Sequence, residues 1–403
     1  MCIRDRWGTN SKYQNKPLWS VGGSWNIYKE KFFQADFVDM LKLRASYGIG
    51  GNIGRNTAPY LIASYYDSSL VDGMAGSVNT PPNKDIRWEK TTTVNVGVDF
   101  ALFRHRLSGT IEYYNKYSVD LLAAINGSPT QGFGYTTLMT NNGKMVNRGV
   151  EITLSGEIIR QKDFSWNASL LYAFNRNKVK HISVQPSLWD SRISMPTSYP
   201  MVGKPLYGIY AYKWAGLNEN GDPQVYDAEN NVTSGPARDY HALVYCGTTV
   251  PIHNASLTNV LRYKGFEFSA MLILDAGHKL RSSNIPSINM SNGRITSTAK
   301  GIVDRWTQPG DVTDVPRLLF SNDTENFNTH RTELYRYSDL FVYDASNIRL
   351  SNISLAYRVP AHWCKKISLS GARLQFNVEN VATFAFDSND DEDTKLILSL
   401  IHI

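Results

Sequence analysis

The residue types that carry enzymatic chemistry are scattered along this chain of 403 residues. An enzyme site needs a nucleophile or metal ligand, an acid or base and a positioning group that converge in one place. The eight histidines stand in separate turns and loops without a partner motif, and neither G-x-S-x-G nor H-E-x-x-H occurs. The sequence therefore predicts no catalytic residue.

Neither the cysteines nor the acidic segments predict a bound cofactor. Cys2, Cys246 and Cys364 form no CxxC pair and no metal-ligand spacing. Cys246 falls in a predicted loop and Cys364 in a predicted turn on the opposite side, so we expect no bond between them. The segments Asn218–Asp222 and Asp387–Asp393 invite a calcium interpretation, but the first lacks an acidic starter and the distal Glu of a calcium loop. Calcium binding there stays open, and no other metal or cofactor is expected.

Strand-length blocks of alternating apolar and polar residues dominate the chain. Val94, Val96, Val98 and Phe100 share one face of an extended segment, and polar or small residues occupy the other face. The segment Phe164–Phe174 repeats the pattern. Period two predicts strands with one apolar and one polar face. Both a soluble sandwich and a membrane barrel have such strands, and the aromatic content of 12% fits either class.

The connections between these blocks have two different lengths. Short turns lie at Arg104–Arg106, Gln161–Asp163, Lys264–Gly265 and around Pro360–Cys364. Long polar stretches lie at Ile53–Asp85, Ser118–Asn147, Asn177–Pro205 and Gly277–Tyr337. Compact domains rarely use repeated loops longer than about 15 residues, whereas transmembrane barrels alternate short periplasmic turns with long external loops. The blocks of about 9–11 residues also match a tilted strand that crosses a bilayer. We therefore predict an all-β, antiparallel transmembrane barrel.

Further features fit this prediction. The block Leu206–Trp214 would reverse the order of the following hairpins if it crossed the membrane, so we expect it in a folded external loop. No stretch approaches the roughly 18 consecutive apolar residues of a membrane helix, so any crossing must be by a closed sheet. The formal charge of +6 is spread along the chain, which does not favour nucleic-acid binding.

The two ends of the chain do not continue the strand pattern. Residues 1–6 and the tail 396–403 resemble translated adapter sequence, and such segments are excluded from fold reasoning. We therefore assign residues 7–386 to the barrel and residues 387–403 to an acidic loop and a non-native tail. The absence of a signal peptide says nothing about export.

Several distinctive segments stand in order along the chain. They are WSVGGSW at Trp19–Trp25, LKLRASYG at Leu41–Gly48, NKDIRWEKT at Asn83–Thr91, NRGVE at Asn147–Glu151, GKPLYG at Gly203–Gly208, DASNIRLSNI at Asp344–Ile353 and NVENV at Asn377–Val381. In this order they resemble the SusC/RagA family of TonB-linked outer-membrane transporters. Each motif alone is weak, but their order and spacing from about Trp19 to Phe386 are specific.

The resemblance implies the C-terminal part of a large barrel in the outer membrane of a Gram-negative bacterium. The family's plug domain, its TonB-contacting box, its early strands and its last strand have no counterpart here. The resemblance also implies import of a glycan fragment or peptide, with a SusD-like surface lipoprotein as a lid. The TonB complex would supply energy through the missing N-terminal part.

Side chains for substrate contact follow from this family interpretation. The polar strand faces are expected to line the lumen, and they carry Asn95, Asp99, Glu112, Glu151, Thr153 and Asn167. Loop aromatic residues can stack on sugar faces, or they can fill small cores within the loops. The candidates are Tyr65, Tyr66, Trp189, Tyr199 and Tyr240.

Three other classes stay open at this point. A passive porin or adhesin barrel needs neither a plug nor TonB. A barrel enzyme lacks a recognisable site here, and a soluble glycan-binding sandwich does not usually carry so many long loops. A barrel segment of this kind would have two unpaired edges, which invite mispairing. We therefore expect the segment, expressed alone, to aggregate instead of inserting into a membrane.

Overall fold

The computed structural model describes residues 17–54, 59–67, 73–80, 82–126, 130, 137–184, 191–235, 239–290, 299–320, 329–366 and 368–386. The predicted end segments 1–6 and 387–403, the candidate Trp189 and the acidic loop Asp387–Asp393 lie outside these residues.

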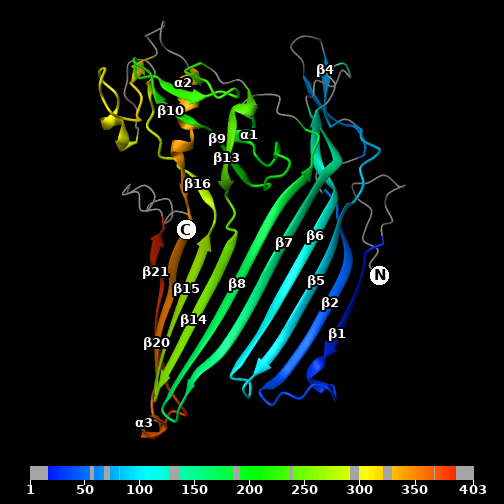
Figure 1. Ribbon diagram of the computed structural model, residues 1–403, viewed down its shortest axis with the longest axis vertical. Coiled ribbons are helices and arrows are strands. Elements are labelled where there is room, and N and C mark those ends of the chain that lie inside the picture. The colour runs from blue at the N-terminus through cyan, green and yellow to red at the C-terminus, as the bar shows by residue number, and fades with distance from the viewer. Residues whose placement is uncertain are drawn as a thin grey trace.

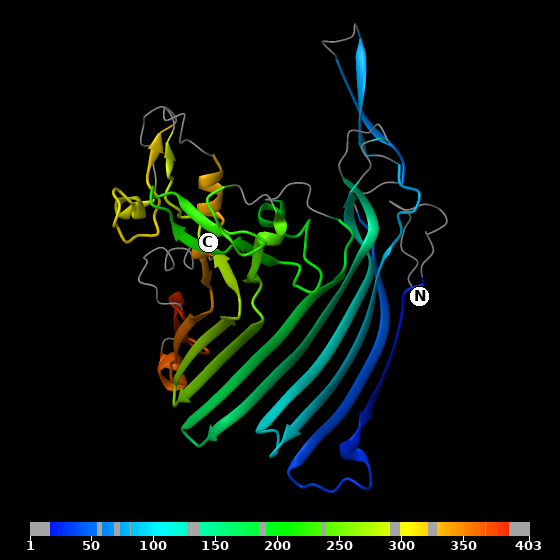
Figure 2. The ribbon, with the colours of Figure 1, turned by 45° about the horizontal axis from the view of Figure 1, so that its top comes forward.

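Ten antiparallel strands form one large sheet, in which every strand pairs with the next sheet strand along the chain. The strands are β1 (Trp19–Asn26), β2 (Val38–Asn52), β5 (Glu89–Leu102), β6 (Leu107–Asn126), β7 (Thr137–Arg160), β8 (Phe164–His181), β14 (His253–Tyr263), β15 (Phe266–Ala276), β20 (Asn347–Arg358) and β21 (Arg373–Ala385). The strands are tilted and the sheet curves like part of a barrel wall (Figures 1 and 2). This up-and-down order is the one that the hairpin pattern predicted.

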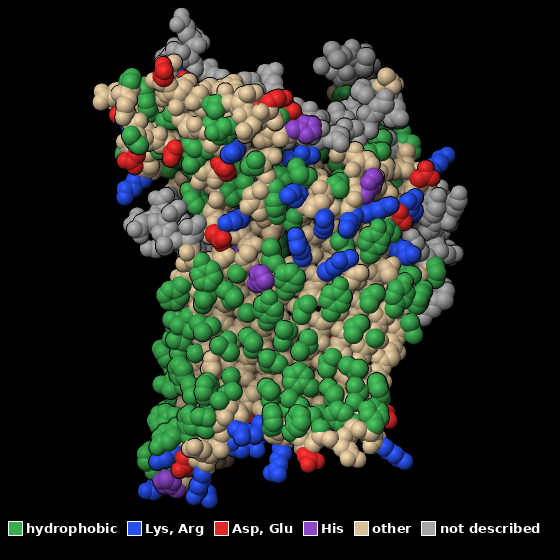
Figure 3. Space-filling view, viewed as in Figure 1, with side chains coloured by type: hydrophobic (Ala, Val, Ile, Leu, Met, Phe, Trp, Pro, Cys, Tyr) green, Lys and Arg blue, Asp and Glu red, His purple; other side chains and the backbone are tan. Residues whose placement is uncertain are grey.

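The register of the sheet places apolar residues on one face across all ten strands. One continuous row of paired positions contains Trp25, Leu43, Val98, Ile111, Ile152, Tyr172, Ala255, Leu274, Ile348 and Phe384. Because successive side chains point to opposite faces, this whole row lies on one side of the wall. Figure 3 shows the resulting belt of hydrophobic side chains over the sheet, with charged side chains at both ends.

The next row of the register carries polar and small residues on the opposite face. It contains Ser24, Arg44, Gly97, Glu112, Glu151, Ala173, Asn254, Asp275, Asn347 and Ala385. An apolar outer band with a polar interior is the arrangement of a transmembrane barrel. A soluble sandwich would instead cover the apolar face with a second sheet. The largest sheet among the described residues leaves that face open (Figure 3).

The short turns gather at one end of the sheet and the long connections at the other, as predicted (Figure 1). The predicted loop Ser118–Asn147 is wrong in its length, because β6 and β7 extend far beyond the membrane-length blocks and pair with each other. The predicted loop Ile53–Asp85 contains a hairpin of β3 (Ile62–Asp67) and β4 (Met74–Thr80). Strands that rise above the bilayer hydrogen-bond to each other and need no apolar face, so membrane length does not limit them.

The two longest connections, β8 to β14 and β15 to β20, fold into a body that we call the loop layer (Figure 1). Its strands are β9 (Gly208–Tyr212), β10 (Trp214–Leu217), β11 (Pro223–Tyr226), β12 (Val232–Thr233), β13 (Leu243–Thr248), β16 (Lys279–Arg281), β17 (Asn289–Met290), β18 (Leu319–Phe320) and β19 (Val342–Asp344). Its helices are α1 (Ser191–Ser194), η4 (Tyr240–Ala242), η5 (Lys300–Asp304), α2 (Thr329–Arg336) and η6 (Asp339–Phe341). The short-turn end carries η2 (Ile27–Lys29) and α3 (Ala361–Lys366).

A small hydrophobic core holds the loop layer together. Tyr210 and Tyr212 of β9, Val225 of β11, Leu243 of β13 and Leu334 of α2 are almost fully buried. Strand β9 pairs with β13 and not with the large sheet, which confirms that Leu206–Trp214 belongs to a folded loop. Among the described residues, no helix is long and apolar enough to cross a bilayer.

Candidate functional site

The polar face of the sheet carries a charged cluster on three neighbouring strands. Arg44 of β2 donates from Nε to Asp99 of β5 at 3.0 Å, and its Nη1 forms an ion pair with Glu112 of β6. The Thr110 hydroxyl donates to the same Asp99 carboxylate at 3.0 Å. These groups are only partly buried, so water reaches them. The cluster therefore gives the inner wall a fixed pattern of charge without a group poised for chemistry.

Register pairing puts all six residues predicted for the lumen on this polar face. Glu112 lies opposite Glu151, and Thr110 lies opposite Thr153. A shallow cavity of about 390 Å³ follows the face further along the sheet. Its lining comes from five strands, and the polar residues in it include Glu151, Thr153, Asn254, Asp275 and Arg349. The face is thus a hydrated, mixed-charge surface of the kind that lines a barrel interior.

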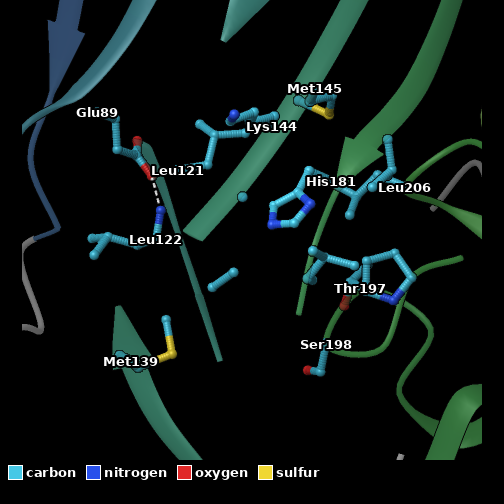
Figure 4. Close-up of a pocket in the computed structure, with 15 residues that line it drawn as sticks. Glu89, Leu121, Leu122, Met139, Lys144, Met145, His181, Thr197, Ser198 and Leu206 are labelled. Atoms are coloured by element: carbon cyan, nitrogen blue, oxygen red, sulfur yellow. Dashed lines mark hydrogen bonds between the residues drawn. The ribbon is translucent and has the colours of Figure 1, made fainter. Parts of the chain in front are cut away.

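A second cavity lies at the long-loop end, where the extended ends of β6, β7 and β8 meet the loop that follows β8. Its volume is about 350 Å³. Figure 4 shows Glu89 and Leu122 on one side of it, and His181, Thr197 and Ser198 on the other. Apolar side chains line much of the remaining wall, including Leu121, Met139, Met145, Val179, Pro200 and Leu206. This combination of apolar walls and a few polar groups is typical of a small-molecule site.

An irregular stretch of β6 shapes one wall of this cavity. Asp120 has a positive φ of 57°, and the pairing register with β7 shifts between Ser118 and Leu121. Asn141 fixes the bulge, because its Nδ2 donates to the carbonyls of Asp120 and Arg87, each at 2.7 Å. Bulges re-aim side chains next to binding sites. Next to the bulge, the Leu122 N–H donates to Glu89 Oε1 at 2.9 Å.

The polar groups around this cavity are engaged by neighbouring protein groups. The imidazole of His181 lies 3.4 Å from the Ser183 hydroxyl, which donates onward to Asn142. A general base needs a positioned partner within reach of a reacting group, and Glu89 is engaged by a backbone N–H and by Asn52. Within the described ranges, no three His, Cys, Asp or Glu side chains come together as metal ligands.

The predicted aromatic contacts fall in different settings. Tyr65 and Tyr66 lie in β3, on the hairpin that rises above the sheet, and are 72% and 53% exposed. Tyr199 is 8% exposed and therefore sits in the core of its loop. Tyr240 begins η4, but its side chain lies outside the described residues, as does Trp189. Of the five candidates, only Tyr65 and Tyr66 have side chains that are both described and exposed.

Asp222, in the Asn218–Asp222 turn considered for calcium, forms ion pairs within the loop layer. Both oxygens of the Asp222 carboxylate are bound by Arg317 at 2.8 and 3.0 Å, and Arg331 donates to it at 3.1 Å. Arg331 is nearly buried and also donates to the carbonyls of Ile288 and Arg317. Burial lowers the pKa of Arg331, an effect that the Asp222 carboxylate opposes. The acidic side chain is thus neutralised by two guanidinium groups.

Residues 4–381 match the sequence profile of the family described as TonB dependent receptor-like, beta-barrel. The chain belongs to this family. TonB-dependent receptor P3 of Formosa agariphila is 27% identical over 399 residues, and TonB-dependent receptor SusC of Bacteroides thetaiotaomicron is 25% identical over 401 residues. Each alignment covers 93% of this chain and 38% of the relative. The family resemblance and the outer-membrane location predicted from the sequence are confirmed.

Two solved structures share the fold of this chain. The RagAB peptide transporter superposes with a TM-score of 0.76 at 23% identity, over 94% of this chain and 41% of that chain. The RagAB peptide importer in its open-open state gives a TM-score of 0.73 at 22% identity. The chain therefore spans about two fifths of the length of the relatives and structures it matches. The sheet is part of a TonB-dependent barrel.

Sequence reasoning missed the cavity at the long-loop end. Its wall is built by Leu121 and Leu122 of β6 and by Met139 and Met145 of β7, all inside the stretch predicted as a loop. The signal was present, because apolar residues continue on both sides of Asn126–Thr137. These apolar residues fit an extension of both strands of the hairpin. The prediction excluded that extension because it limited each strand to the length that crosses a bilayer.

Proposed function

We propose that this chain forms part of the wall and the outer mouth of an energy-coupled importer for glycan fragments or peptides. The observation that carries the proposal is the loop layer, a folded body with its own buried core at the long-loop end of a TonB-dependent barrel. Loops that are pre-organised in this way offer a fixed surface for a ligand or a lid. A passive porin needs only an open pore and no such body.

A SusD-like surface lipoprotein is the proposed lid, and the TonB complex is the proposed energy source. The similarity to the RagAB peptide transporter supports a peptide as the cargo class, and the resemblance to the SusC/RagA family adds glycan fragments. The loop layer lies at the end of the sheet where a lid would meet the barrel (Figure 2). The cavity lined by Glu89 and His181 borders the loop that follows β8, and we propose that cargo enters there.

The full-length protein in its own outer membrane tests this proposal. Uptake of a labelled oligosaccharide or peptide mixture is measured with and without the proton-motive force, and in a strain without TonB. Import that stops in both conditions supports the transporter. Import that continues in the TonB-deficient strain, or an upstream coding sequence without a plug domain, would favour the passive porin. Co-purification of a lipoprotein with the tagged barrel tests the lid separately.

Tyr65 and Tyr66 are the proposed aromatic contacts for cargo. Truncation of an exposed aromatic anchor at a binding surface commonly costs more than 1 kcal/mol, or about fivefold or more in affinity. We expect Tyr65→Ala and Tyr66→Ala each to weaken cargo binding by that factor. Tyr263→Ala is the matched control, because Tyr263 is also 53% exposed but ends β14 beside a short turn. Equal affinities for all three variants would remove the β3 hairpin from the cargo site.

A further inference from the structure

The outward face of β8 changes from apolar to basic residues along the strand. From the short-turn end, that face carries Phe164, Trp166, Ala168, Leu170, Tyr172 and Phe174, and then Arg176, Lys178 and Lys180. The three basic residues alternate with Asn177 and Val179, so they continue the lipid-facing row and do not enter the lumen. All three are exposed, whereas Val179 is buried. The basic residues therefore begin where the apolar belt ends.

Neighbouring segments add positive charge at the same level. Arg148 of β7 lies directly opposite Arg176 in the pairing register. The Lys204 carbonyl accepts from the Val179 N–H at 2.9 Å, and its ammonium group lies 4.7 Å from the centre of the Tyr245 ring. Figure 3 shows Lys and Arg side chains directly above the apolar belt, over the upper ends of β7 and β8. We call Arg148, Arg176, Lys178, Lys180 and Lys204 the basic step.

The basic step lacks compensating acids. Within the described parts of the chain, no carboxylate forms an ion pair with any of its five residues. Arg148 donates from Nε to the neutral Asn115 side chain, at 3.0 Å. Like charges placed directly opposite each other on a sheet are destabilising, so the Arg148–Arg176 pair costs stability unless an anion lies between them.

The position of the basic step relative to the bilayer limits which anion can bind to it. Tyr172 and Phe174 lie just below it, and the Tyr172 hydroxyl is 2.8 Å from Nδ1 of His253 on β14. Such an aromatic boundary marks the interface between hydrocarbon and headgroups. The step is thus at headgroup level on the side of the long loops. Arg and Lys side chains bind phosphate well, and phosphate is the anionic group of many lipid headgroups.

We propose that the basic step binds the phosphate groups of a glycolipid in the outer leaflet of the outer membrane. The lipid chains would pack against the apolar row below, on Leu170, Tyr172 and Phe174, while its phosphorylated sugars meet the five cations. Basic pockets beside membrane-spanning segments bind anionic headgroups in this way. The glycolipid would neutralise the Arg148–Arg176 repulsion and hold the loop layer against the membrane surface.

The test uses the full-length protein purified from outer membranes in mild detergent. The variant Arg176→Gln/Lys178→Gln/Lys180→Gln removes three charges from the step. The control Lys162→Gln/Lys264→Gln/Lys365→Gln removes three charges from the short-turn end. Bound phosphorylated glycolipid is quantified by mass spectrometry, and both proteins are required to run as heat-modifiable barrels. We expect the step variant to retain at least about fivefold less glycolipid than the wild type, and the control to retain as much.

Two further measurements distinguish a lipid site from a site for a soluble anion. The variant Arg176→Lys/Lys178→Arg/Lys180→Arg keeps the charge and should keep the lipid, and Arg176→Gln alone provides a milder loss if the triple variant does not fold. Phosphorylated lipid A should raise the melting temperature of delipidated protein more than dephosphorylated lipid A does. Equal retention by the step variant and the control would overturn the proposal. Equal stabilisation by inorganic phosphate would overturn it too, because the site would then bind a soluble anion.

Discussion

Arg44 on strand β2 reaches Glu112 on strand β6 across the intervening strand β5, and the residue of β5 at that register position is Gly97. A Cβ atom at Gly97 would lie 3.1 Å from Cγ of Glu112 and 3.3 Å from Cζ of Arg44. The glycine thus leaves room for an ion pair that spans three strands. On the far side of Glu112 lies Glu151, a like charge directly opposite.

Replacing Arg44 tests how much this arrangement contributes to the stability of the barrel. In Arg44→Met the carboxylates of Asp99 and Glu112 lose their shared cation. We expect the free energy of unfolding to fall by about 1–2 kcal/mol, below the usual value for buried charged pairs because the guanidinium is one third exposed. The measurement is the midpoint of urea unfolding of the full-length barrel. Lys42→Met, on the same face of β2, is the control and should change the midpoint little.

Filling the space at Gly97 should have a related effect. Valine has a higher strand propensity than glycine, so Gly97→Val would stabilise β5 if space were unimportant. We expect it to lower the urea midpoint instead, because its side chain displaces Arg44 from Glu112. In the Arg44→Met background the same substitution should cost much less, since the pair is already broken. Additive losses in the double variant would contradict this interpretation.

We expect Asp222 to stabilise the loop layer without contributing to the stability of the barrel. Asp222→Asn leaves Arg317 and the nearly buried Arg331 without their carboxylate. Breaking a largely buried ion pair in this way should cost about 2–3 kcal/mol. Limited proteolysis on intact cells should then cut the loops, while the barrel stays heat-modifiable on a cold gel. Asp227→Asn, in the turn between β11 and β12, is the control and should resist the protease like the wild type.

The loop layer should also loosen in mild acid. Burial lowers the pKa of His278 below its ordinary value of 6.5, and the weaker opposing influence comes from Asp275 and Asp344. Among the described residues, Nδ1 of His278 has no hydrogen-bond partner. The unfolded layer therefore binds the extra proton more readily, so stability is full above pH 6.5 and falls as pH drops through the lowered pKa. Proteolysis at pH 7.5 and pH 5 should show this difference in the wild type. His278→Gln should reduce it, and an unchanged difference would assign the effect to other groups.

The sequence predicted the fold well because the deciding signals are local. The alternation at Val94–Phe100 and the short turns at Gln161–Asp163 and Lys264–Gly265 fix the faces and the order of the strands. The features that the sequence did not predict depend on contacts between residues far apart in the chain. The bulge at Asp120 depends on Asn141, and Asp222 finds its partners Arg317 and Arg331 far along the chain. Period-two patterns contain no information about such contacts, so the sequence could place neither the bulge nor the partners of Asp222.

The last prediction concerns the edge strands of the large sheet, β1 and β21. They end the order of the large sheet, and every residue of β1 is exposed. The exposed apolar side chains of β21 include Leu374 and Phe376, each at 68%. An exposed strand edge with apolar side chains is a template for pairing with another chain.

We therefore expect residues 1–403, expressed alone and refolded into detergent, to form aggregates. Phe376→Lys, which puts a charge on the edge strand, should reduce them because charged edge residues block strand addition. Sedimentation measures the aggregated fraction, and a cold gel detects the folded monomer. A monomeric, heat-modifiable species formed by the unmodified chain would contradict the prediction, since it would require β1 and β21 to be paired or protected. If Phe376→Lys aggregated as much as the parent, β21 would not be the edge that nucleates the assembly, leaving β1 with Trp19 and Val21 as the edge to test next.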